Sequence, residues 1–143
     1  MVEHSAGAII FRMEKGRPLY LLLHYEAGHW DFAKGHIEKG EKTEETVRRE
    51  TLEEAGIDDL QFVRGFKETV RYWMRPRKTK KDAKIKYPSS AQGGTLKFVV
   101  FYVAQTKTSE VTLSFEHKGY VWLSYEEAVK KASEELKKRY GRI

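Results

Sequence analysis

The sequence predicts an α/β fold in which a mixed β-sheet is sandwiched between α-helices. Apolar, β-rich runs recur along the 143 residues, helical signals are confined to two segments, and no internal repeat is present. Strands that surround two helices in one unit favour an α/β/α sandwich. A chain of this length is typical of a single domain with a sizeable core, so we expect residues 1–143 to form one domain.

The first half of the chain predicts a hairpin and then a helix. Residues 5–12 and 19–25 are rich in β-forming side chains, and the turn-forming segment 14–18 lies between them. Helical signals begin near Thr43, whose hydroxyl can cap the first turn, and end at Gly56. Glycine is favoured just after a helix because it adopts left-handed backbone angles readily.

The second half predicts more strands and a final helix, with strands at 61–73, 96–104 and 120–123. Residues 96–104 are nearly all apolar, which suits a strand buried on both faces. Ser124 can cap the last helix, with Glu127 three residues later completing a capping box. We expect this helix to end at Gly141.

Composition narrows the class of protein. Cysteine is absent, which excludes disulfides and thiolate metal sites. No apolar run reaches about 18 residues, and the N-terminus lacks the pattern of a secretory signal, so we expect a cytoplasmic protein without a membrane partner. Asparagine is absent while Lys, Arg and Glu are abundant, a composition that points weakly to a hot-growing source.

The positive charge is concentrated in one stretch. The formal net charge is +6, and residues 71–86 hold eight Lys or Arg and one Asp. Such a stretch attracts polyanions, for example polyphosphates or nucleic acid. The alternative is a solvated surface loop with no ligand.

The most informative segment is residues 35–57, which follow the spacing G-x5-E-x7-R-E-x-x-E-E-x-G through Gly35, Glu41, Arg49, Glu50, Glu53 and Glu54. On a helix, Glu50, Glu53 and Glu54 share one face and repel each other by about 0.2–0.5 kcal/mol per pair. Hard cations such as Mg²⁺ or Mn²⁺ prefer oxygen ligands and would relieve this repulsion. The opposite face, Val47, Thr51 and Ala55, can pack on the sheet. A solvent-exposed helix with Glu/Lys pairs is the alternative.

This spacing resembles the signature of the Nudix hydrolases, which cleave a nucleoside diphosphate linked to another group. The resemblance implies that the Gly35 carbonyl, Glu50, Glu53 and Glu54 bind Mg²⁺ or Mn²⁺, with more than one ion present alongside the substrate. It also implies that Arg49 braces the loop and that water attacks phosphorus in line. Either Glu50 or Glu54 could be the base. Thr51 stands where the signature has a larger aliphatic residue.

Three further segments, SAGAIIFR, YLLLHYEAGHWDFAKGHIEKGE and LSFEHKGYVWLSYEEA, are similar to those of asymmetric diadenosine tetraphosphate hydrolases. The likeness covers roughly residues 5–75 and 95–130. It implies that Lys34 and Lys97 bind phosphate and that Glu116 supports the metal or the attacking water. It also implies that Tyr72 and Tyr120 stack on either side of an adenine. His29 is a further candidate for phosphate contact.

The substrate remains open because residues 74–95 form a basic insertion that is longer than we expect in the animal enzymes. The leading hypothesis is Mg²⁺-dependent cleavage of diadenosine tetraphosphate into ATP and AMP. The first alternative is a Nudix pyrophosphohydrolase for triphosphorylated or capped RNA, an inositol pyrophosphate or a modified nucleotide. The second is a non-catalytic module that binds nucleotides or RNA, which is disfavoured because Glu50, Glu53 and Glu54 are all present. The sequence does not separate monomer from dimer.

Overall fold

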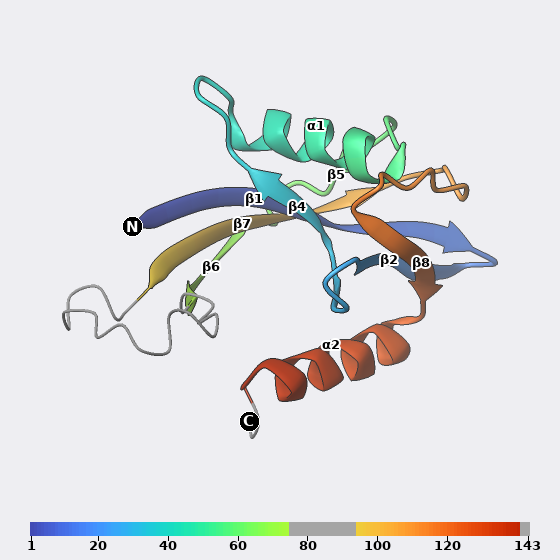
Figure 1. The fold of residues 1–143 in the computed structure, drawn as a ribbon. Coiled ribbons are helices and arrows are strands. Elements are labelled where there is room, and N and C mark those ends of the chain that lie inside the picture. The colour runs from blue at the N-terminus through green and yellow to red at the C-terminus, as the bar shows by residue number, and fades with distance from the viewer. Residues whose placement is uncertain (75–93, 141–143) are drawn as a thin grey trace.

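The computed structural model describes residues 1–74 and 94–140, and it confirms the α/β sandwich. Helices α1 (Thr43–Ala55) and α2 (Tyr125–Tyr140) lie on opposite sides of one mixed sheet (Figure 1). The strands are β1 (Val2–Glu14), β2 (Arg17–Tyr25), β3 (Trp30–Asp31), β4 (Ala33–His36), β5 (Gln61–Phe62), β6 (Glu68–Met74), β7 (Thr95–Gln105) and β8 (His117–Leu123). Most of the predicted basic insertion lies outside the described residues.

The sheet is built around a parallel pair, β1 and β7, and all other pairs are antiparallel. Strand β1 pairs with β2 near the hairpin turn and with β4 nearer its own start. The short strands β3 and β4 therefore fill the space where the two hairpin strands diverge. Gly7 permits this approach, because a Cβ there would lie 2.6 Å from the Cβ of Lys34. Strand β4 places Gly35 beside Glu50 of α1.

The predicted strands are confirmed, with three differences. The short strands β3 and β4 were not predicted. The run 61–73 is divided into β5 and β6 by a turn. Strand β7 is central, but its buried side chains are Val99, Tyr102 and Ala104, so it is not fully covered on both faces. The reason is that α2 packs on β2, β3 and β8 and leaves one face of β7 partly open.

The predicted ends of α1 are correct, but its capping residue is not. Gly56 has a φ of 69° and its amide donates to Leu52 O. The helix begins at Thr43, yet the Thr43 hydroxyl bonds to the Tyr102 hydroxyl instead of capping the helix. Lys42 occupies the N-cap position, and its amide donates to the Glu45 carboxylate at 3.2 Å.

The predicted capping box of α2 is confirmed. The Ser124 amide donates to the Glu127 carboxylate at 3.1 Å, and the Glu127 amide donates to the Ser124 hydroxyl at 3.3 Å. The predicted end at Gly141 lies outside the described residues. In the described ranges, neither helix is long and apolar enough to cross a membrane.

The core lies between α1 and the sheet. Val47, Thr51 and Ala55 are almost fully buried, which confirms the predicted packing face of α1. Val47 and Ala55 join a cluster with Ala6, Ala8, Leu23 and other apolar side chains of the sheet. This packing directs the face that carries Glu50, Glu53 and Glu54 toward β4.

Candidate active site

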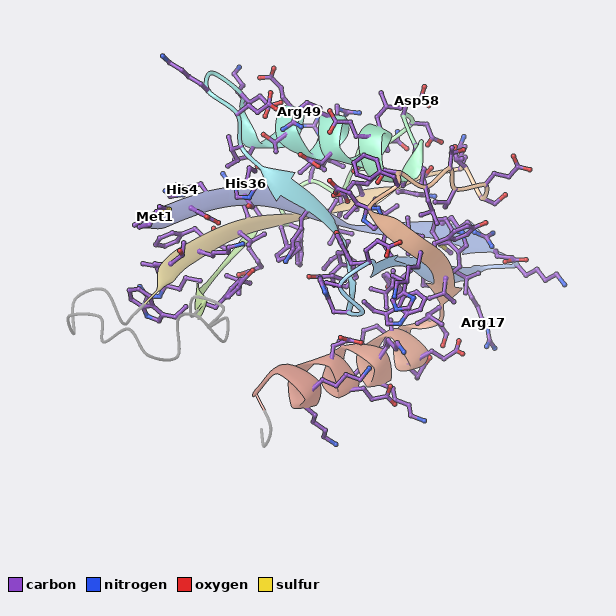
Figure 2. The ribbon with its side chains drawn as sticks, in the orientation of Figure 1. Met1, His4, Arg17, His36, Arg49 and Asp58 are labelled. Atoms are coloured by element: carbon purple, nitrogen blue, oxygen red, sulfur yellow. The ribbon has the colours of Figure 1, made fainter. Side chains whose placement is uncertain are left out.

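An open cavity of about 610 Å³ lies between α1, β4 and the turn before β8. Its lining includes the predicted residues Lys34, Gly35, Glu50, Glu53, Glu54 and Glu116, together with Tyr25, His36, Glu38, Ser114 and Phe115. The structure thus brings every predicted metal-binding residue to one place. Figure 2 labels His36, which lines this cavity, and Arg49 on the adjoining helix α1.

Arg49 links the loop after β4 to helix α1. Its Nε and Nη2 donate to the two carboxylate oxygens of Glu41 at 2.7 and 3.0 Å, and Nη2 also donates to His36 O at 2.9 Å. These bonds from Arg49, with one from the Glu38 amide, lower the pKa of Glu41 to about 2. Glu41 and Arg49 therefore brace the loop, as the resemblance implied.

Glu50 and Glu53 are both directed toward Arg49. Arg49 Nη1 lies 2.8 Å from Glu50 Oε1 and 3.3 Å from Glu53 Oε2. Burial raises the pKa of Glu50, with Glu53 and Glu116 adding to the rise against the opposing effect of Arg49. The Glu50 carboxylate also lies against Gly35, so closely that a Cβ at Gly35 would overlap it.

Glu54 is the most buried of the four predicted carboxylates Glu50, Glu53, Glu54 and Glu116, with 5% of its surface exposed. Its burial and the nearby charge of Glu50 raise its pKa to about 8, although the Lys34 amide donates to it. The Tyr25 hydroxyl lies 3.5 Å from Glu54 Oε2, and His117 Nε2 lies 4.0 Å away. This environment favours the protonated form of Glu54 when no positive charge is nearby.

Tyr25 and His117 form the wall behind Glu54. The sequence predicted this place for neither residue, and His117 was only a candidate for phosphate contact. Burial is the main cause that raises the pKa of the Tyr25 hydroxyl, which also donates to Phe32 O at 3.1 Å. The His117 side chain is fully buried, and its Nδ1 lies 3.0 Å from the Ser114 hydroxyl. His117 Nε2 has no hydrogen-bond partner among the described residues. Their sequence positions alone carried no signal, because each needs the β2–β8 pairing to reach Glu54.

The donor set fits a hard divalent cation. The four predicted carboxylates and Glu38 line one cavity. Burial is the main cause that raises the pKa of Glu50 and Glu54, and neighbouring negative charge, which a cation would offset, adds to it. Within the described ranges, no three acidic or histidine side chains converge as they stand on a single point. The reason is that Glu50 and Glu53 point to Arg49.

The predicted phosphate-binding lysines lie near Tyr72. Lys34 Nζ lies 2.8 Å from Asp31 Oδ2 and 5.9 Å from the centre of the Tyr72 ring. Burial disfavours the charged form of Lys34, but Asp31 outweighs this effect and the pKa is raised. Lys97 is the strand neighbour of Tyr72, and its Nζ lies 3.3 Å from Glu3 Oε2.

The structure does not bring Tyr72 and Tyr120 together, so the predicted adenine sandwich between them is wrong. Strand β6, with Tyr72, pairs beyond β7, whereas β8, with Tyr120, pairs beyond β2 at the other end of the sheet. Side chains alternate along strands, so Tyr120 shares the α1 face with Leu23, and Tyr72 lies on the opposite face. His29 stacks on Tyr25 with 4.7 Å between ring centres and lies outside the cavity lining.

Known proteins of one family are similar to this chain along most of its length. The NUDIX domain family matches residues 2–142. The asymmetrical bis(5'-nucleosyl)-tetraphosphatase of Sus scrofa is 34% identical over 142 residues, covering 90% of this chain and 83% of that protein. The crystal structure of a Caenorhabditis elegans Ap4A hydrolase binary complex superposes with a TM-score of 0.72 and 30% identity, covering 92% of this chain and 86% of that one.

A second kind of relative matches a shorter part of the chain. The RNA pyrophosphohydrolase of a Nitratiruptor species is 34% identical over 98 residues, covering 68% of this chain and 60% of that protein. Both kinds of relative, the family match and the glutamate-lined cavity lead to the same conclusion. The chain belongs to the Nudix family and is a pyrophosphohydrolase of that family.

Proposed function

We propose that this protein hydrolyses diadenosine tetraphosphate to ATP and AMP. The observation that carries the proposal is the cavity lined by Glu50, Glu53, Glu54 and Glu116 and braced by Arg49. The relatives that match along nine-tenths of the chain are named for asymmetrical cleavage of this class of substrate. The cytoplasmic location and the hot-growing source stay predictions from the sequence.

Different side chains of the cavity have different roles in the proposed hydrolysis. A water oxygen forms a bond to one phosphorus while the anhydride bond to the neighbouring phosphate breaks, and one product is AMP. Nudix hydrolases generally need a divalent metal, and Mg²⁺ or Mn²⁺, held by the Gly35 carbonyl and the carboxylates as more than one ion, would polarise the phosphorus. Glu54 is the better candidate for the base, because Arg49 bonds to Glu41, Glu50 and Glu53 and leaves the Glu54 carboxylate able to accept a proton once a cation is bound. Glu50 is held by Arg49. Lys34, which lines the cavity, is the proposed phosphate ligand there, whereas Lys97 lies outside the lining beside Tyr72, and its phosphate contact stays a prediction from the resemblance.

The experiment that tests the proposal is product analysis by anion-exchange chromatography. The protein would be incubated with Mg²⁺ and diadenosine tetraphosphate, diadenosine triphosphate, triphosphorylated RNA or an inositol pyrophosphate. Equal amounts of ATP and AMP, formed fastest from the tetraphosphate, are expected. Rapid turnover of another substrate with slow cleavage of the tetraphosphate would show that diadenosine tetraphosphate is not the preferred substrate. The protein would still be a Nudix pyrophosphohydrolase.

RNA is the second candidate substrate, because the RNA pyrophosphohydrolase relative matches two thirds of the chain and residues 71–86 are strongly basic. Contacts to several phosphates make binding weaken steeply as salt rises. We expect the KM for diadenosine tetraphosphate to change little between low and moderate NaCl at constant Mg²⁺. A steep rise, shared by a triphosphorylated RNA substrate, would favour the RNA activity. Tight nucleotide binding with no turnover of any substrate would favour the non-catalytic module.

A change at Tyr120 tests its proposed contact with adenine. Tyr120 is 41% exposed on the α1 face of β8. Loss of a base–aromatic stack costs about 1–3 kcal/mol, so Tyr120→Ala should raise KM with little change in kcat. Tyr72→Ala is the matched variant on the opposite face. An unchanged KM in Tyr120→Ala would show that Tyr120 does not contact the substrate.

A further inference from the structure

Phe115 is an exposed aromatic side chain at the rim of the catalytic cavity. It is 89% exposed, more than any other large hydrophobic residue among those described, and it lines the same cavity as Glu50, Glu53 and Glu54. Its neighbour Glu116 is one of the four carboxylates. A phenyl ring in this position buries little surface in the free protein and so contributes little to folding.

The backbone around Phe115 is tied to the catalytic elements. The Ser114 amide donates to Glu54 O at 3.3 Å, at the end of α1, and the Glu26 amide donates to Glu116 O at 2.9 Å, beyond β2. The His117 amide closes the turn by donating to Ser114 O at 3.2 Å. The turn therefore places Phe115 at a defined position relative to Glu54.

The Ser114 side chain reinforces the same turn. Its hydroxyl accepts from the Glu116 amide at 3.4 Å and lies 3.0 Å from His117 Nδ1, whose ring is fully buried. A phenylalanine has two side-chain torsions, so ordering its ring costs little entropy. A rigid turn that carries an exposed ring beside a phosphate site is suited to stacking on a planar group joined to that phosphate.

We propose that Phe115 stacks on the nucleobase of the nucleoside whose phosphate occupies the catalytic cavity, and that it makes the enzyme prefer purines to pyrimidines. Every base has a face for stacking, and a purine covers more of the phenyl ring than a pyrimidine does. This role of Phe115 rests on the proposed function, because it assumes that the substrate is a nucleoside polyphosphate. It also replaces the adenine sandwich that the separate faces of Tyr72 and Tyr120 do not form.

Kinetics on two symmetrical substrates test the preference. Wild-type protein should cleave diadenosine tetraphosphate roughly tenfold more efficiently than diuridine tetraphosphate, as kcat/KM. In Phe115→Ala the ratio should fall close to one, mainly through the KM of the adenine substrate, and Phe115→Trp should keep it. Tyr125→Ala is the matched control, because Tyr125 is 63% exposed on α2 and lies outside the cavity lining. An unchanged ratio in Phe115→Ala would overturn the proposal.

A binding measurement separates this role from the proposed activity. In Phe115→Trp, AMP should quench tryptophan fluorescence beyond the change seen in wild type, and ribose 5-phosphate, which lacks a base, should not. If wild type cleaves neither dinucleotide, the proposed function fails while the AMP result still decides the role of Phe115. Equal responses to AMP and ribose 5-phosphate would overturn the stacking role whatever the activity.

Discussion

Replacing Glu54 with Gln should lower turnover by orders of magnitude and, in the presence of a chelator at pH 8, make the protein more stable. Glu54 is buried near Glu50, Glu116 and Tyr25, and burial raises its pKa to about 8. A buried carboxylate without a compensating charge is unfavourable. Glutamine keeps the shape of the protonated acid and removes that charge, but it can neither accept a proton from water nor supply a charged ligand.

The pH dependence follows from the direction of this shift. Because the folded pKa is above the ordinary value of 4.5, folding favours protonated Glu54. The stability that this group contributes is fully present below pH 4.5 and is lost as the pH rises through about 8. Each unit of the shift corresponds to about 1.4 kcal/mol. The metal-free wild type should therefore lose on the order of 2–4 kcal/mol between pH 5 and 8 relative to Glu54→Gln.

Urea unfolding in a chelator at pH 5, 6, 7 and 8 measures this difference, and product analysis in Mg²⁺ measures turnover. Turnover should fall by roughly 10²–10⁴-fold in Glu54→Gln. Glu53→Gln is the matched control on the same helix, because the Glu53 side chain is 57% exposed. It should reduce activity and leave the pH dependence of stability unchanged. Wild-type turnover in Glu54→Gln would contradict the assignment of this helix as the catalytic element.

Replacing Gly35 with Ala should disable the site through Glu50. The added methyl group would overlap the Glu50 carboxylate, so Glu50 must move from its place beside Gly35 and Arg49. Displacement of a catalytic group by about 1 Å can cost about 100-fold in rate. We expect a loss of that order in kcat and weaker Mg²⁺ binding by calorimetry.

Gly119→Ala is the control for the Gly35 variant, since a Cβ at Gly119 meets no atom within 4 Å. It should keep wild-type activity and stability. A folded Gly35→Ala protein with wild-type turnover and Mg²⁺ affinity would show that the close approach of Gly35 to Glu50 does not matter for catalysis.

Features governed by neighbours along the chain were predictable. The glutamate spacing placed three carboxylates on one face of α1, Gly56 ended that helix, and Ser124 with Glu127 capped α2. Each depends on backbone geometry over three or four residues, which local sequence specifies. The error at Thr43 arose because a partner from β7, the Tyr102 hydroxyl, engages its side chain.

Features that depend on the order of strands were not predictable from the chain alone. Tyr72 and Tyr120 lie far apart because β6 pairs with β7 and β8 pairs with β2, and the register of these pairs puts the two side chains on opposite faces. Tyr25 and His117 reach Glu54 through the β2–β8 pairing, and Phe115 stands at the cavity because its turn bonds to the end of α1. The spacing of the glycine, arginine and glutamate residues in 35–57 thus predicted the catalytic chemistry. The burial that raises the pKa of Glu54, and the aromatic ring available to a substrate, arise from contacts between residues far apart in sequence.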